Sequence, residues 1–211
     1  SLDKLGVGPV DLLLLHYPSI KDEYAIEDYM AQFAEVYDAV LTKRLGVSNF
    51  TIRYIDRARE LLGDRSIFTN QVELHPFLSN SPIVEHCAAN GIQMTAYSPL
   101  ARGAVIKDPV LQAIAADLSA TPTQVSLAYL LAKGHIVIPS AGHPARIAEN
   151  FGAHGLTLST EHLASIDALD RNERLVHCPR CPVWEQPSST KKPRSYRRFL
   201  IRCQTGGDVK L

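Results

Sequence analysis

Hydrophobic residues are distributed along the chain in two alternating patterns. Short continuous apolar runs that end at a polar residue are typical of parallel strands buried on both faces. Between these runs, hydrophobic residues recur at helical spacing, which predicts helices that each cover the sheet with one apolar face. The runs predict five strands, at Val10–His16, Arg44–Ser48, Ile67–Gln71, Ile92–Tyr97 and Ile136–Pro139.

Capping residues indicate where the helices begin. Thr51, Asp108 and Thr121 each precede an apolar-periodic segment at the position of an N-cap, and Thr121 with Gln124 has the spacing of a capping box. Ser81 is predicted as a further N-cap, with Pro82 at the first helical position. The expected order is therefore β-α-β-α-β-α-β-α-α-β-α-α. Its last two helices are expected at Pro144–Gly152 and around Leu163–Leu169.

This regular alternation predicts an α/β fold with a mostly parallel sheet covered by helices. Two architectures fit the pattern, an open doubly wound sheet and a (β/α)8 TIM barrel. No G-x-G-x-x-G follows the first strand, which weakens the doubly wound dinucleotide-binding interpretation. A closed barrel has eight strands over roughly 250 residues. The visible strands would therefore make only part of a barrel, short by about three βα units.

Polar residues stand at the carboxyl end of each expected strand. Barrel enzymes build their active sites at that end of the sheet, so this placement favours a barrel enzyme. The series consists of His16, Ser48-Asn49, Asn70-Gln71, Tyr97-Ser98 and Ser140.

The composition is that of an ordinary globular protein, with 45% hydrophobic residues, 21% charged residues and zero formal net charge over 211 residues. A neutral chain is a poor binder of nucleic acids or membrane surfaces. Four cysteines are too few for a disulfide scaffold, so we expect a reducing, cytoplasmic setting. No apolar run is long enough to span a membrane, and no secretory signal is visible. The absence of an initial Met suggests a fragment.

The zero net charge conceals a basic C-terminus. Residues 187–211 contain seven Lys and Arg residues against the single acid Asp208. Together with Pro187–Thr190 and the pair Gly206-Gly207, this composition predicts a disordered tail, and we place a domain boundary near Gln186. Contact with RNA or anionic lipid is the functional alternative, and translation outside the native frame is another.

The cysteines near this boundary do not predict a metal centre. Cys178 and Cys181 form one C-x-x-C pair beside His177, but no second pair follows, and structural zinc sites need four ligands. We therefore expect no metal. His75 and His86 are expected to be structural or exposed rather than ligands.

A series of motifs in the same order resembles the aldo-keto reductase family. The motifs are Leu13–Pro18 (LLLHYP), Leu45–Phe50 (LGVSNF), Asn70–Pro76 (NQVELHP), Ala96–Leu100 (AYSPL) and Ile138–Ser140 (IPS), followed by Arg146–Asn150 (RIAEN). Their order and spacing resemble the family from its fourth barrel strand to its eighth, over about residues 1–186. Within the family, the chain is most similar to bacterial 2,5-diketo-D-gluconate reductases of the B type. This finer similarity lies in His16–Ser19, Asn49–Ile52, Ser140 and Leu169–Val176.

The resemblance implies a partial TIM barrel and an NADPH-dependent reductase of small aldehydes, α-dicarbonyls or keto-sugars. It implies a catalytic role for His16, which would bind the substrate carbonyl and orient it for hydride transfer. Ser48, Asn49 and Gln71 would hold the nicotinamide carboxamide, whose donors and acceptors suit hydroxyl and amide groups. Tyr97 would stack on the nicotinamide ring.

The same resemblance implies the remaining contacts with cofactor and substrate. Many family members have Lys at the position of Ser140, so this chain has one cation fewer for the adenosine 2′-phosphate. Tyr17 and Trp184 would line the substrate side. Each implied role has a structural alternative, as a strand-end turn, a core tyrosine or a surface arginine. The other cofactor contacts would be Ser98, Leu100 and Gly103 at the pyrophosphate, Ser140 and Arg146 at the 2′-phosphate, and Glu149 and Asn150 at the adenine.

The chain departs from the family pattern at its start. The family's catalytic Tyr, its assisting Lys and an Asp belong to the first three strands, and no such strands precede Val10. Hydride addition to a carbonyl creates an alkoxide that must be protonated, and a Tyr needs a neighbouring cation to be a competent acid. We therefore expect an N-terminally truncated reductase whose present chain is inactive alone.

Three functional hypotheses follow. The first is the truncated NADPH-dependent reductase, from a mainly monomeric family. The second is a non-catalytic nucleotide-binding or scaffold remnant, which NADPH binding without turnover would favour. The third is a nucleic-acid-associated protein in which the basic tail makes the contacts.

Overall fold

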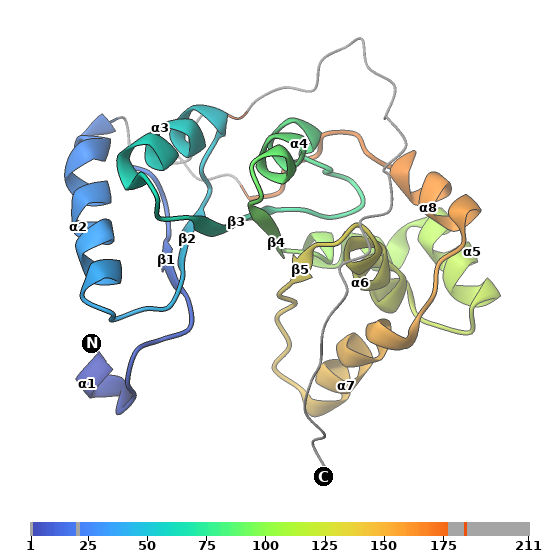
Figure 1. Cartoon of the computed structure of the whole chain (residues 1–211). Coiled ribbons are helices and arrows are strands. Elements are labelled where there is room, and N and C mark those ends of the chain that lie inside the picture. Colours follow the sequence, from blue (N-terminus) through green and yellow to red (C-terminus); the bar gives the residue numbers. More distant parts are fainter. Residues whose placement is uncertain (1, 20–21, 177–183, 185–211) are drawn as a thin grey trace.

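Five parallel strands form one sheet whose spatial order follows the sequence (Figure 1). The computed structural model describes residues 2–19, 22–176 and Trp184 of the chain. A doubly wound sheet reverses its strand order at a switch point, whereas a barrel does not. The unreversed order identifies the fold as a partial TIM barrel. Its strands are β1 (Leu13–Leu15), β2 (Leu45–Ser48), β3 (Ile67–Glu73), β4 (Gln93–Tyr97) and β5 (Ile136–Val137).

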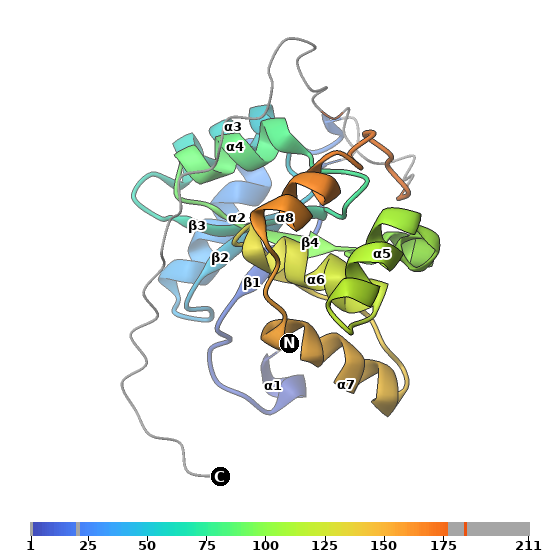
Figure 2. The ribbon, with the colours of Figure 1, turned by 90° about the vertical axis from the view of Figure 1, so that its right-hand side faces the viewer.

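Helices connect the successive strands. In Figure 2, α3 and α4 lie side by side over one face of the sheet, and the His86 side chain of α4 bonds to Asp56 of α3 at 2.7 Å. Among the described helices, three were not predicted from the sequence: the α-helix Leu2–Leu5 before the first strand and two 3-10 helices, at Ala101–Lys107 and Ala153–Gly155. The α-helices are α1 (Leu2–Leu5), α2 (Ile26–Asp38), α3 (Ile52–Leu62), α4 (Ser81–Ala89), α5 (Pro109–Asp117), α6 (Pro122–Ala132), α7 (Pro144–Gly152) and α8 (Thr160–Asp167).

The core lies between the sheet and these helices. Strand β2 is buried along its whole length, and its Leu45 and Val47 belong to the same hydrophobic cluster as Ile55 of α3. Gly46 leaves room where β1 and β3 approach β2, because a Cβ on it would lie 2.8 Å from a Leu14 methyl group and that side chain would have to shift. Close packing around β2 therefore fixes where the ends of β1, β2 and β3 lie relative to one another.

From β1 onward the order of strands and α-helices agrees with the sequence prediction, but β1 and β5 are clearly shorter than expected, and β3 continues past Gln71 to Glu73. Beyond β1, Val10 forms only an isolated bridge with Thr42. Within the described residues, β1 and β5 each have a single neighbouring strand, so their ends gain less from pairing. Strand β5 ends before Pro139, which has no N–H to donate to a ladder.

Three of the four predicted N-caps stand at the N-cap of their helix, and two of these three form side-chain capping bonds. Asp108 accepts hydrogen bonds from two backbone N–H groups of α5, and the Thr121–Gln124 capping box forms as predicted. Ser81 is not an N-cap, because α4 begins at Ser81 and Asn80 precedes it with a left-handed φ of 48°. Thr51 stands at the N-cap of α3 but makes no side-chain capping bond.

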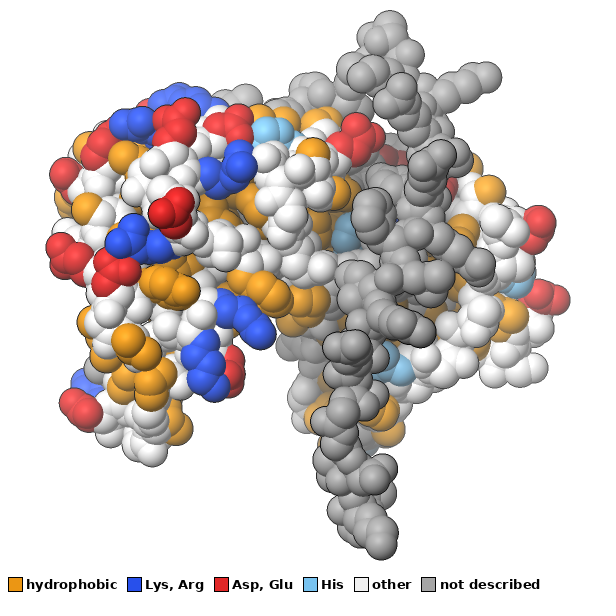
Figure 3. All heavy atoms as spheres, in the orientation of Figure 1, with side chains coloured by type: hydrophobic (Ala, Val, Ile, Leu, Met, Phe, Trp, Pro, Cys, Tyr) orange, Lys and Arg blue, Asp and Glu red, His pale blue; other side chains and the backbone are white. Residues whose placement is uncertain are grey.

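Both outer strands of the described sheet have hydrophobic side chains exposed near them. Figure 3 shows such side chains gathered around α1, below β1. The exposed residues are Leu5, Val7, Val40 and Leu41 on the β1 side, and Ile136, Ile138, Ile147 and Phe151 on the β5 side. A sheet with two open edges and apolar borders has surface available for further βα units.

None of the helices described is long and apolar enough to cross a bilayer. The same part of the chain holds no group of three or more His, Cys, Asp or Glu residues that could bind a metal ion. The predicted boundary near Gln186, the basic tail at 187–211 and the pair Cys178 and Cys181 lie outside the described residues.

Candidate functional site

The carboxyl ends of β1 to β4 are joined by hydrogen bonds centred on Asn49. Its side-chain amide donates to the His16 carbonyl and to Ser48 Oγ, each at 3.1 Å, and its Oδ1 accepts from the Tyr97 hydroxyl at 2.9 Å. The Asn49 N–H and the Ser48 hydroxyl donate to the Gln71 carbonyl, at 3.0 and 2.8 Å. Five residues singled out from the sequence therefore meet in one network.

The backbone turn at the end of β2 places Asn49 at the centre. Asn49 has a left-handed φ of 62° and is 1% exposed. Asparagine tolerates this conformation better than most residues do. Its buried amide is hydrogen-bonded at both its nitrogen and its oxygen, as a buried polar group requires. The turn and the network thus hold the side chain in one orientation.

Unused hydrogen-bonding capacity remains in this network. An amide oxygen has two lone pairs, and Tyr97 occupies one of those on Asn49 Oδ1. The Gln71 side chain is half-buried, and its amide forms no hydrogen bond to any other described residue. A planar carboxamide has both donors and an acceptor, so it matches Asn49 Oδ1 together with the side-chain amide of Gln71. The site residues therefore fit a nicotinamide carboxamide.

His16 and Tyr17 lie at the end of β1. The His16 side chain is exposed, and its ring centroid is 4.8 Å from that of the half-buried Tyr17. An imidazole N–H donates readily to a carbonyl oxygen. The exposed ring of His16 is therefore available to a carbonyl compound at the open end of the sheet.

The segment after β4 has an unusual backbone. Leu100, a predicted contact in this segment, is half-buried and packs against the core. Left-handed non-glycine residues are costly, and they cluster at ligand-binding sites. A Cβ on Gly103 would meet no atom within 4 Å, so its φ, and not lack of space, favours glycine. Four residues here have positive φ: Ser98 (51°), Ala101 (46°), Arg102 (52°) and Gly103 (91°).

The residues predicted at the adenosine end lie on the segment from β5 into α7. Ser140 and Arg146 are exposed, and Asn150 is half-buried. The Glu149 carboxylate accepts a hydrogen bond from the Thr121 hydroxyl of α6 at 2.7 Å. Glu149 therefore joins α7 to α6, a structural role that the sequence prediction did not include.

One buried cluster near the site was missed by sequence reasoning. Glu73, the last residue of β3, has no exposed surface, and it accepts hydrogen bonds from the backbone N–H groups of Leu175 and Val176. Burial alone would raise the pKa of Glu73, but bonds from His75 and these N–H groups outweigh it and lower the pKa. The available signal was an acidic residue in an otherwise uncharged strand, because unpaired carboxylates are rarely buried.

Comparisons with known proteins give consistent matches. The model of the aldo/keto reductase family matches residues 1–171. Methylglyoxal reductase DkgB of Escherichia coli O157:H7 is 42% identical over 176 residues, which make up 83% of this chain and 66% of that protein. Glyoxal reductase of Bacillus subtilis strain 168 is 36% identical over 177 residues, covering 83% of this chain and 62% of that protein.

A solved structure agrees with these relatives. It is described as "Crystal structure of a putative 2,5-diketo-D-gluconic acid reductase B", and it superposes with a TM-score of 0.83 and 32% identity. The superposition covers 88% of this chain and 66% of that one. The chain thus spans about two thirds of the length of the proteins it matches, 66% in the case of the Escherichia coli relative.

Proposed function

The chain belongs to the aldo/keto reductase family, and on this premise we propose that it carries the nicotinamide-binding strand ends of an NADPH-dependent carbonyl reductase. Members of this family are oxidoreductases that use nicotinamide cofactors and act on small carbonyl compounds. The hydrogen-bonded network around Asn49 carries the proposal, because it joins four strands beside the Gln71 amide, which bonds to no other described residue. The proposed substrates are small aldehydes, α-dicarbonyls or keto-sugars, since relatives are named methylglyoxal and glyoxal reductases.

The proposal gives each residue of the network a task. Bound NADPH supplies the hydride. Ser48, Asn49 and Gln71 hold its carboxamide and so fix the orientation of the ring. Tyr97 is held through its hydroxyl by Asn49, and its aromatic face would pack on the nicotinamide. His16 binds the carbonyl oxygen of the substrate and orients it toward the ring.

The rest of the cofactor is assigned to the two segments that follow. The left-handed backbone at Ser98–Gly103 is proposed to approach the pyrophosphate, beside Leu100. The exposed Arg146 guanidinium suits the adenosine 2′-phosphate, since arginine binds phosphate oxygens in a bidentate manner. Ser140 adds a neutral contact there, and Glu149 and Asn150 lie toward the adenine.

The reductase also needs a proton donor that we place outside this chain's sheet. We propose that three further βα units extend the edges at β1 and β5 and carry that donor, with residues 1–186 as the reductase unit and 187–211 as a separate tail. The chain alone would bind NADPH without turnover. A completed barrel that still lacks turnover would support the alternative of a non-catalytic nucleotide-binding remnant. The proposed partners are small carbonyl compounds. The proposed setting is the reducing cytoplasm, because four cysteines are too few for a disulfide scaffold.

NADPH binding by this chain tests the proposed site. We expect Gln71→Leu, measured by the fluorescence of the reduced nicotinamide, to weaken binding about tenfold, because the lost hydrogen bond is worth about 1.4 kcal/mol. Gln32→Leu, on the exposed face of α2, is the matched control and should bind NADPH as the unsubstituted chain does. Absence of NADPH binding, or equal binding by Gln71→Leu, would contradict the proposal.

A further inference from the structure

The buried carboxylate of Glu73 lies directly beside the proposed nicotinamide site. Glu73 is the register neighbour of Tyr97 across the β3–β4 pair. The next residue, Leu74, donates its N–H to the Tyr97 carbonyl at 3.3 Å. The segment that binds to Glu73 therefore lies one strand away from Tyr97, the residue proposed to stack on the cofactor.

Glu73 holds the segment Asp170–Val176, which we call the strap. The carboxylate accepts from the backbone N–H groups of Leu175 at 2.8 Å and Val176 at 3.2 Å. Arg174 lies 3.7 Å from the same carboxylate and donates to Asn80 Oδ1 at 2.7 Å. Asn80 in turn donates to the Glu73 carbonyl at 2.7 Å. These contacts close a ring between the end of β3 and the strap.

The strap is also attached at its other end. Ser79 donates its hydroxyl and its N–H to the carboxylate of Asp170. The N–H groups of Arg171 and Glu173 both donate to the Phe77 carbonyl, at 3.3 and 3.0 Å. The strap therefore has one defined path over the loop that follows β3.

Arg174 connects this ring to Trp184. Its guanidinium lies over the indole ring, 4.2 Å from the ring centroid. Trp184 is half-buried and packs against the main hydrophobic cluster. A cation over an indole face is attractive, and it fixes the plane of the ring. Arg174 thus positions Trp184, and Asn80 and Glu73 position Arg174.

Stability alone does not account for these charges. A buried ion pair adds little over well-packed hydrophobic residues of similar volume, because both charges lose their hydration. Directional hydrogen bonds, however, allow one arrangement where apolar contacts would allow several. The hydrogen-bonded ring of Glu73, Asn80 and Arg174 is therefore suited to fixing the position of Trp184.

We propose that Glu73 and Arg174 are positioning residues that fix Trp184 at the carboxyl end of the sheet, where its indole forms part of the wall of the substrate site. The docking of Trp184 stands on the contacts above. Its role toward substrate rests on the proposed function.

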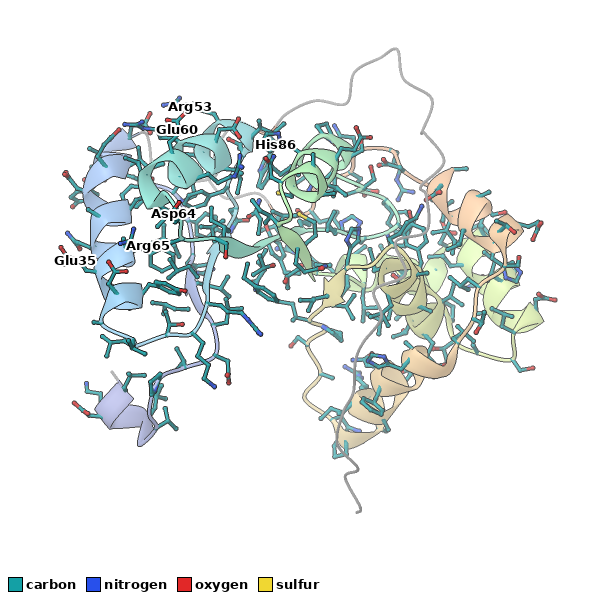
Figure 4. All side chains as sticks on the ribbon, in the orientation of Figure 1. Glu35, Arg53, Glu60, Asp64, Arg65 and His86 are labelled. Atoms are coloured by element: carbon teal, nitrogen blue, oxygen red, sulfur yellow. The ribbon has the colours of Figure 1, made fainter. Side chains whose placement is uncertain are left out.

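The chain has a single tryptophan, so its fluorescence reports on Trp184 alone. We expect Arg174→Gln to shift the emission to longer wavelength and to increase acrylamide quenching severalfold, with a far-UV circular dichroism spectrum like that of the unsubstituted chain. Arg174→Lys keeps the cation and should restore most of the protection. Arg53→Gln makes the same change at an exposed site on α3 (Figure 4) and should leave Trp184 unchanged.

Glu73→Gln tests the other end of the connection. It removes the charge that faces Arg174 while keeping an acceptor for the strap, so quenching of Trp184 should rise here as well. Where circular dichroism shows that Glu73→Gln does not fold, Arg174→Gln decides the question. Equal quenching of Trp184 in folded Arg174→Gln and in the unsubstituted chain would overturn the inference.

NADPH separates this inference from the proposed function. Reduced nicotinamide absorbs where tryptophan emits, so NADPH bound at the strand ends should quench Trp184 by energy transfer. Arg174→Gln should bind NADPH with unchanged affinity but with a smaller loss of Trp184 emission. Unchanged transfer would refute the placement of Trp184 beside the site. Absence of NADPH binding would refute the proposed function, and acrylamide quenching would still decide whether the cluster docks Trp184.

Discussion

At the residue scale, the two buried polar groups of the strand ends are accommodated by different means. Asn49 is neutral, and its amide is matched by uncharged partners on three neighbouring strand ends. Glu73 is a carboxylate, and it needs backbone N–H groups from a distant segment in addition to His75. A neutral amide costs less to bury than a charge. Loss of the strap should therefore cost more free energy at Glu73 than loss of any single partner would at Asn49.

We expect the acid limb of the stability profile to depend on Glu73. Because its pKa is lowered from the ordinary value of 4.5 in the folded chain, its contribution to the free energy of unfolding is complete above that value. The contribution is lost as the pH falls through the lowered pKa. His75 and Arg174 are the charged or titratable groups that face the carboxylate. Urea unfolding at a series of acidic pH values measures the slope.

Glu73→Gln should flatten this acid limb, because a glutamine does not titrate. Glu35→Gln is the matched control, since Glu35 is exposed on α2 (Figure 4) and its carboxylate bonds to no other residue in the described part of the chain. A Glu73→Gln variant that keeps the full slope would show that another group governs the acid limb.

At the element scale, the capping box that begins helix α6 also attaches α7. Thr121 accepts from the Gln124 N–H at 3.2 Å within the capping box, and its hydroxyl donates to Glu149 at 2.7 Å. The Gln124 amide adds a bond to the Glu149 carbonyl at 3.1 Å. The cap that begins α6 therefore also attaches α7, the helix that carries Arg146.

Thr121→Ala should lower the free energy of unfolding by about 2 kcal/mol, the upper end of the range for loss of an N-cap, because the bond to Glu149 is lost too. Thr121→Ser keeps the hydroxyl and should cost much less. Chemical denaturation of the two variants measures the difference. Equal destabilisation by both would mean that the methyl group, and not the hydroxyl, stabilises this junction.

At the scale of the whole molecule, the described sheet is open where a closed barrel is continuous. Strand β1 pairs with β2 alone and β5 with β4 alone among the described strands. Phe151 of α7 is 74% exposed, with its ring 5.5 Å from that of His154. Three added βα units would cover this border, and hydrophobic side chains there would then be buried.

Phe151→Ala therefore gives opposite expectations in two contexts. In this chain it should change the free energy of unfolding by less than about 0.5 kcal/mol, as exposed sites do. In a fusion that adds the first three βα units of a relative, it should cost about 3 kcal/mol or more, as for a buried Phe. The same fusion should reduce methylglyoxal with NADPH.

Tyr24→Ala is the matched control for Phe151→Ala, because Tyr24 is exposed near the start of α2, away from β5. It should be neutral in both contexts. A Phe151→Ala change that is neutral in a folded, active fusion would contradict the proposed completion of the barrel at α7.

Local patterns determined much of the fold. Apolar runs predicted all five strands, and helical spacing with cap residues predicted α2 to α8, because each signal lies within one element. The strand ends were less well predicted: Val10 and Pro139 lie outside β1 and β5. Ladder pairing sets these ends, and pairing depends on a second strand.

By itself, the sequence determined the order of strands and α-helices from β1 onward, the caps at Asp108 and Thr121, and the series of polar residues at the strand ends. The tertiary structure decided which of these residues meet. Asn49 bonds to Tyr97, 48 positions away, and Glu73 to Val176, 103 positions away. Local periodicity and cap chemistry act over a few residues, whereas these partners are brought together only when the sheet forms and the strap returns to it.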